Sequence, residues 1–411
     1  MSERSRVSLL LGPLLLAAFV LLVVSGVAEL AAWEGAPPPA RGSRPVDQAA
    51  QITQPLTTPL PITRTTLLPL MSRMGLLLPP PLPPPVPVAV TEPLDVESVR
   101  AALAAEGKEL GLARIGFHVG PDDGDTDPEL LAWMAALDAA GIPFVLKSVD
   151  NAEPVEQAIE MKVASGVPHV IIYRRSVDAG DVPRYDLPPD EAAVIHWERH
   201  RDNFPLELRP YKDQLWLETV NEIDKERAAW LGLFAQKTAR LAILDGFNWA
   251  AFGWSSGEPE AEHWRVPEMR DFLRLVAAHP DRLAIAVHEY SLDPDDVSEG
   301  YPWLVGRFQH LFEVADSYRI RRPTVLITEW GWTHEDLPGP ETAMEQIAWA
   351  SWLYAAYPQV KGAAIWYLGP NFGGIREKTR LLIEPVREYT LHHYFEVEPG
   401  WGQIDVTLFW P

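Results

Sequence analysis

From about Leu94 to the C-terminus, short apolar or β-branched runs alternate with longer amphipathic stretches. The short runs predict eight strands, at residues 113–119, 143–149, 169–175, 214–222, 241–247, 283–290, 324–330 and 362–368. The longer stretches predict helices, for example at residues 127–141, 152–166, 266–280 and 341–358. Several of these begin at Asp, Asn or Pro and end at Gly or Pro, which are common start and stop signals. This alternation is typical of β/α units.

Eight strands with intervening helices predict an α/β fold for residues 94–411, namely a (β/α)8 TIM barrel rather than a doubly wound sheet. No glycine-rich dinucleotide fingerprint and no phosphate-binding loop follows any predicted strand. The pattern therefore gives no support to a nucleotide-dependent enzyme.

Residues 34–93 are dense in proline, as in "LLPPPLPPPVPVAVTEP". Proline fixes φ and lacks an amide donor, so this range cannot form a helix or a central strand. A polyproline II spacer is the interpretation we favour, with a proline-rich ligand for a recognition domain as the alternative. Residues 64–90 include "LLPLMSRMGLLL", which is apolar enough to pack on the barrel.

Residues 1–33 begin with a basic head containing Arg4 and Arg6, followed by apolar sequence from about Val7 to Val27. This run approaches the ~20 residues that span a bilayer. The preceding arginines predict a cytoplasmic N-terminus with the rest of the chain outside. A retained transmembrane anchor and a cleaved signal peptide both fit, because Gly26 and Ala28 could form a cleavage site. We expect an extracytoplasmic protein, either membrane-anchored or secreted.

The formal net charge is −22 and no basic stripe is visible, which argues against a nucleic-acid partner. There are no cysteines, which excludes disulfides, thiolate metal sites and a cysteine nucleophile. Any catalytic chemistry must therefore use other side chains.

Polar and aromatic residues stand at the predicted strand ends, where (β/α)8 enzymes carry their chemistry. Asn221 and Glu222 end the fourth strand and Glu329 ends the seventh. The sixth strand ends in "HEY", the eighth supplies Trp366, and the first supplies His118. Paired carboxylates are what glycoside hydrolysis requires, one as a proton donor and one as a nucleophile. Aromatic rings suit the apolar faces of sugars, and the chain contains 16 tryptophans.

The motifs "TVNEID" and "LITEWGW" resemble the strand 4 and strand 7 signatures of the clan A retaining glycoside hydrolases, which include the family 5 cellulases and family 39 enzymes. The resemblance covers the whole predicted barrel. It implies that Glu222 is the acid/base, that Glu329 is the nucleophile and that Asn221 binds the sugar 2-hydroxyl. By the same resemblance, Tyr290 hydrogen-bonds Glu329 and His288 lines the site.

The resemblance also implies that Trp366 is the platform for the sugar beside the cleavage point. Two positions depart from the pattern: Ile223 replaces a proline that many members have after the acid/base, and no arginine is fixed near the nucleophile by the motifs alone. Candidates for that arginine, by strand position, are Arg114, Arg174 and Arg175. Glu218 shares the parity of Glu222 and would need a buried partner such as an arginine or Lys147.

Other aromatic and histidine positions allow two interpretations. Trp330 could bind substrate or belong to the core with Trp332. Trp249 and Trp254 could line subsites or cover the helix layer. His118 is equally consistent with a structural role and with a place in the site.

Two acidic or histidine patterns suggest metals but are better explained otherwise. "PDDGDTDPE" lacks the glycine and closing glutamate of a calcium loop, and Asp127 before a proline is a good helix N-cap. His196 and His200 are spaced for zinc, but Trp197 stands where a metalloprotease has its glutamate, so we expect a solvated helix face. We predict neither a metal nor a cofactor.

The sequence thus predicts a retaining O-glycosyl hydrolase that acts on a β-linked poly- or oligosaccharide. The ionised Glu329 is expected to raise the pKa of Glu222, as a proton donor requires. A non-catalytic glycan-binding surface protein on the same barrel, and a transglycosylase that uses the same residues, remain as alternatives.

Overall fold

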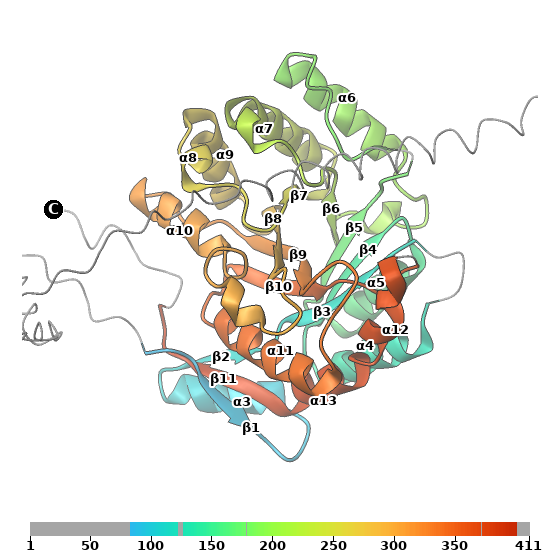
Figure 1. The fold of residues 1–411 in the computed structure, drawn as a ribbon, viewed down its shortest axis with the longest axis vertical. Helices are drawn as coiled ribbons and strands as arrows, with labels where there is room; N and C mark the ends of the chain where they lie inside the picture. Colours follow the sequence, from blue (N-terminus) through green and yellow to red (C-terminus); the bar gives the residue numbers. More distant parts are fainter. Residues whose placement is uncertain (1–82, 122–125, 178, 371, 401–411) are drawn as a thin grey trace, which may run out of the picture. The chain divides into compact units, whose positions relative to one another are not determined.

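The computed structural model describes residues 83–121, 126–177, 179–370 and 372–400, all within the second of two units, Leu78–Pro411. Eight parallel strands close into a barrel in the order β10-β3-β4-β5-β6-β7-β8-β9, which confirms the predicted (β/α)8 fold (Figure 1). The strands are β3 (Ile115–Val119), β4 (Val145–Val149), β5 (Val170–Arg174), β6 (Trp216–Glu218), β7 (Asn248–Trp254), β8 (Leu283–Tyr290), β9 (Val325–Gly331) and β10 (Val360–Ile365).

Helices surround the barrel, and the four that the sequence placed most clearly are confirmed (Figure 1). They are α4 (Pro128–Ala139), α5 (Glu153–Ser165), α9 (Pro267–Ala278) and α11 (Pro340–Ala355). The remaining helices near the barrel are α6 (Pro189–Asp202), α7 (Ala228–Leu244), α8 (Ala261–Trp264), α10 (Phe308–Ser317), α12 (Ile375–Arg380) and α13 (Ile383–His392). Asp127 caps α4 as predicted, accepting a 2.9 Å hydrogen bond from the Glu129 amide.

The predicted fifth strand, residues 241–247, is wrong. Its first residues are the last turn of α7, and the strand is β7, directly after it. A short apolar run before a glycine fits a helix end as well as a strand, because its length is too short to show a period. Burial separates the two: Leu244 is 80% exposed, whereas every residue of β7 is buried. Gly246, at φ +84°, adopts the left-handed conformation in the turn between them.

The strand pairing of the barrel shifts register at several points, and two of these shifts put an extra residue near the end of β7 and of β9. The pairing of β7 with β8 shifts between Ala251 and Trp254, and the pairing of β9 shifts against both β8 and β10 just after Ile327. Such bulges change which side chains face inward beyond them. Both bulges lie at the ends of the strands that carry the candidate site.

A second sheet, antiparallel and of order β1-β11-β2, was not predicted. It consists of β1 (Val86–Ala89), β2 (Glu109–Leu112) and β11 (His393–Val397), with α3 (Val96–Ala105) beside it (Figure 1). β1 falls inside the range predicted as linker, but it is an edge strand, and edge strands tolerate proline. The indole of Trp352 donates a 2.9 Å hydrogen bond to the Pro85 carbonyl.

The predicted anchor or signal segment, residues 1–33, lies outside the described residues, as does the linker up to residue 82. Within the part of the chain that the structure describes, no helix combines the length and apolar character needed to cross a membrane.

Candidate active site

Two carboxylates, one beyond the end of β6 and one in β9, lie beside the same imidazole. His288, near the end of β8, places its Nδ1 atom 3.3 Å from Glu222 Oε1 and 3.5 Å from Glu329 Oε2. The two oxygens therefore cannot be farther apart than the sum of these distances. That limit includes the ~5–5.5 Å of retaining glycosidases and reaches only the lower end of the ~6.5–9.5 Å of inverting ones.

Glu329 is buried, and its carboxylate lies beside a hydroxyl donor, a guanidinium and an imidazole. Tyr290 donates a 2.8 Å hydrogen bond to Glu329 Oε2, the contact that the family resemblance implied. Arg174 Nη1 lies 3.6 Å and His118 Nε2 lies 3.9 Å from Oε1. Arg174 is thus the cation beside the proposed nucleophile, out of the three arginines that strand position allowed. A carboxylate held by a cation and a donor is suited to act as a nucleophile.

Glu222 lies beyond its strand rather than in it. β6 ends at Glu218, and the chain then leaves the ladder, so the predicted strand 214–222 is too long. Glu222 has φ +46°, a left-handed conformation that costs a non-glycine residue free energy and is often found at functional sites. Its amide donates a 2.8 Å hydrogen bond to the Gly253 carbonyl, and its side chain is 46% exposed. The carboxylate is therefore open to a ligand.

The pKa of Glu222 is lowered to about 2, chiefly because its carboxylate is hydrogen-bonded to His288. The expectation that Glu329 raises the pKa of Glu222 is therefore wrong for this arrangement. Hydrogen bonding that favours the charged form outweighs the effect of burial.

Two further site residues have strongly shifted pKa values. Burial and the charge of Glu329 raise the pKa of Tyr290 well above its usual value, so its hydroxyl remains a donor. Burial, and then the cations Lys147 and Arg174, lower the pKa of His118 well below its usual value. His118 is thus a neutral imidazole beside Glu329.

Asn221 is held in place by its side chain and its backbone. Its Oδ1 accepts a hydrogen bond from Arg174 Nη1, and its amide donates to the Asp181 carbonyl at 3.2 Å. The two side-chain N–H donors of Asn221 are then the groups with which it can bind a ligand hydroxyl.

Trp366 follows β10, and its half-buried ring stacks on Tyr367 at 4.2 Å with an interplanar angle of 14°. The ring of His118 lies 4.9 Å from it. Glycines at 120 and 369 leave room for Tyr367, since a Cβ at either position would lie within 2.4 Å of its ring. Tyr367 thereby supports one face of the Trp366 indole.

The other candidate tryptophans are not at the site. Trp330 is fully buried and packs edge-on against Trp332 at 5.1 Å. Trp249 and Trp254 are strand residues of β7 and are also fully buried. All four belong to the core between the barrel and its helices.

The structure adds residues that strand-end motifs could not locate. His334, in the loop after β9, is exposed and lies 4.9 Å from the ring of Tyr290. Phe372, in the loop after β10, is 44% exposed and meets Trp366 edge-on at 5.2 Å. Loop conformation leaves no periodic signal in a sequence, so nothing pointed to either residue.

Residues 122–125 of the calcium-like pattern lie outside the described residues. Among the residues that the structure describes, no group of three or more metal-ligating side chains occurs. The face of α6 that carries His196 and His200 is buried rather than solvated as expected. His200 Nε2 lies 3.0 Å from the Gly180 carbonyl, and burial lowers the pKa of both histidines. These imidazoles are neutral parts of the core.

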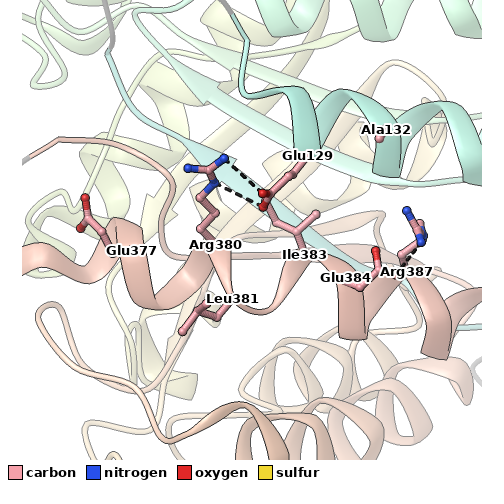
Figure 2. A pocket seen from close by; sticks show the side chains of 8 residues that line it. All are labelled: Glu129, Ala132, Glu377, Arg380, Leu381, Ile383, Glu384 and Arg387. Carbon is pink, nitrogen blue, oxygen red and sulfur yellow. Dashed lines mark hydrogen bonds and ion pairs between the residues drawn. The ribbon is translucent and has the colours of Figure 1, made fainter.

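A surface pocket between α4, α12 and α13 contains none of the predicted site residues (Figure 2). Its charged groups are largely paired with one another: Arg380 with Glu129 at 3.2 Å, and Arg387 with Glu384 at 2.5 Å. The strand-end cluster, and not this pocket, is therefore the candidate active site.

No protein-family model matches this chain, and neither does any curated protein. Several solved structures do match this chain. A Thermomonospora fusca β-mannanase in complex with mannotriose is 14% identical and covers 66% of this chain and 83% of its own, with a TM-score of 0.36. A GH5-4 broad-specificity endoglucanase from Clostridium acetobutylicum is 12% identical. The match covers 68% of this chain and 97% of the endoglucanase chain, with a TM-score of 0.40.

A GH5 xyloglucan-specific endo-β-1,4-glucanase from a metagenomic library, solved with cellotriose, is 11% identical. It covers 70% of this chain and 95% of its own, with a TM-score of 0.39. GH5 is the family 5 that the strand-end motifs resemble.

Proposed function

We propose that this protein is a retaining glycoside hydrolase that cleaves β-linked glycan. The observation that carries the proposal is the meeting of Glu222 and Glu329 at the Nδ1 atom of His288. Two carboxylates at this spacing, one buried among donors and one open to a ligand, fit the two roles of double displacement.

In the first step, Glu329 attacks the anomeric carbon and the bond to the leaving oxygen breaks, while Glu222 gives that oxygen a proton. In the second step, Glu222 takes a proton from water, and the resulting hydroxide displaces Glu329 from the sugar. Arg174 and Tyr290 contact the Glu329 carboxylate and hold it in position.

The low pKa of Glu222 bears on the first step, because a proton donor must be protonated. Its main cause is the hydrogen bond with His288. When substrate binds, its glycosidic oxygen takes the place of His288 as the hydrogen-bond partner of Glu222. The hydrogen bond that lowers the pKa is then lost, and the bound substrate buries the Glu222 carboxylate. Both changes raise the pKa of Glu222 toward a value that suits an acid.

The test is turnover of aryl β-glycosides and β-glucans by the wild-type chain, Glu222→Gln and Glu329→Gln. We expect Glu329→Gln to lose at least ~10³-fold in kcat on every substrate. Glu222→Gln should lose glucan cleavage but still react with aryl glycosides whose leaving groups need no proton. Glu345→Gln, an exposed carboxylate on α11, is the matched control and should retain activity.

No turnover by the wild-type chain on any substrate, with unchanged glycan binding in both variants, would instead support a glycan-binding protein. Product analysis with excess acceptor sugar separates hydrolysis from transglycosylation, because a transglycosylase would form longer glycans rather than free reducing ends.

We also propose that residues 1–33 place the barrel outside the cytoplasmic membrane, as an anchor or as a cleaved signal. The basic head before an apolar run supports this. Fractionation of cells that express the full chain tests it: recovery in the cytosol with an intact N-terminus would rule it out.

A further inference from the structure

An ion pair lies inside the barrel beneath the two carboxylates. Lys147 of β4 and Glu218 of β6 contact each other through Nζ and Oε2, and neither side chain has exposed surface. The sequence predicted that Glu218 would need such a partner. Burying two charges costs free energy, and a hydrophobic pair of similar size is often at least as stable. Stability alone therefore gives little reason for this pair.

Glu218 reaches the bulge in β9. Thr328 Oγ1 donates a 3.1 Å hydrogen bond to Glu218 Oε1, and Thr328 directly precedes Glu329 at the point where the register of β9 shifts. Leu326 belongs to the cluster of residues inside the barrel, so strict alternation would turn residues 328 and 330 inward and residue 329 outward. The extra residue reverses this: Glu329 enters the site and Trp330 packs in the outer core.

Glu218 also reaches the bulge in β7. Gly253, at φ +52°, lies so close that a Cβ there would be 2.7 Å from Glu218 Oε1. The Gly253 carbonyl is the acceptor for the Glu222 amide. One carboxylate thus touches the backbone that holds Glu222 and the residue that precedes Glu329.

We propose that the Lys147–Glu218 pair is a positioning element for both carboxylates, acting through the bulges of β7 and β9. Lys147 orients the Glu218 carboxylate. Glu218 in turn accepts the hydrogen bond from the Thr328 hydroxyl and packs against the backbone at Gly253, which holds both bulges in position. This inference rests on the proposed hydrolase function for its kinetic test only.

The test compares pairs of variants that differ by one hydroxyl: wild type with Thr328→Val, and Thr328→Ser with Thr328→Ala. In each pair the chain without the hydroxyl should lose about 10–100-fold in kcat on an aryl β-glycoside, with KM within about 3-fold, because a small misplacement of a reacting group has effects of this size. Thr328→Ser should keep kcat within about 3-fold of wild type. Equal kcat within both pairs overturns the proposal.

Two further measurements separate positioning from general loss of structure. In a chain that already carries Lys147→Met and Glu218→Leu, the carboxylate that accepts the Thr328 hydrogen bond is absent. Thr328→Val should then have no additional effect on kcat. An additional loss as large as in the wild-type background contradicts the proposal.

The crystal structure of Thr328→Val needs no turnover and so remains decisive if the chain is not a hydrolase. We expect Glu329 to lose the 2.8 Å contact with Tyr290 that the wild-type chain makes. An unchanged position of Glu329 overturns the proposal, whereas absence of wild-type turnover concerns only the proposed function.

Discussion

The hydrogen bond between His288 and Glu222 controls the charge of the proposed acid. His288→Phe keeps a ring and removes the nitrogen, so the pKa of Glu222 should rise from about 2 toward its ordinary ~4.3. An acid must be protonated, so activity falls as pH rises through its pKa. The basic limb of the kcat/KM profile should therefore move up by about 1–2 pH units. A basic limb that stays in place would show that His288 does not set this pKa.

Tyr290 acts on the other carboxylate. Tyr290→Phe removes the 2.8 Å hydrogen bond to Glu329 and leaves the ring in place, so kcat should fall about 10–100-fold. Because Tyr290 does not bond Glu222, the basic limb of the pH profile should stay where it is in wild type. Rapid kinetics on an aryl glycoside measure both effects, and a wild-type kcat would remove Tyr290 from the proposed mechanism.

At the scale of the element, the residue between His288 and Tyr290 ties β8 to α10. Glu289 points away from the site, and its Oε2 accepts hydrogen bonds from the Gly306 amide at 2.8 Å and the Tyr354 hydroxyl at 2.7 Å. Its Oε1 accepts from the Phe308 amide, at the first turn of α10. Burial raises the pKa of Glu289 to about 7.

This raised pKa links stability to pH. Folded Glu289 binds its proton more tightly than the unfolded chain does, so its stabilising effect is complete below about pH 4.5 and is lost as pH rises through about 7. Relative to Glu289→Gln, the free energy of unfolding of wild type should fall by about 3 kcal/mol over that window. Urea denaturation at several pH values measures it, with Glu345→Gln as the control. Parallel pH curves for wild type and Glu289→Gln would contradict the shift.

A strand or helix could be predicted from the sequence only where its own residues carried a clear hydrophobic pattern or end signals. The four helices predicted from their amphipathic pattern, and β8 with its long apolar run, were placed within about three residues of their observed ends. The β7 strand was missed because α7 ends in an equally apolar run. The bulges of β7 and β9 left no signal, because a bulge is defined by the register against other strands.

At the scale of the whole molecule, β1 closes the edge of the second sheet. It pairs with β11 over four residues, and Val90 donates a 2.9 Å hydrogen bond to the His392 carbonyl. A chain that begins at Leu94 should lose about 1–3 kcal/mol in free energy of unfolding relative to one that begins at Leu78, because it lacks these contacts.

The two chains should have the same kcat on an aryl glycoside at 20 °C or below, since β1 contributes no residue to the site. Thermal and urea denaturation provide the measurement. Identical unfolding midpoints would show that β1 adds nothing to the stability of the barrel.

The sequence by itself determined that the chain forms an eight-stranded (β/α)8 barrel and that Glu222 and Glu329 lie at or just beyond strand ends, because these depend on local patterns and on short motifs. The tertiary structure decided which tryptophans are core, that Arg174 stands beside Glu329, that His196 and His200 are buried and that Glu222 is ionised. Each of these depends on neighbours distant in sequence. Burial, strand register and electrostatic environment arise only when the strands pair and the helices pack around them.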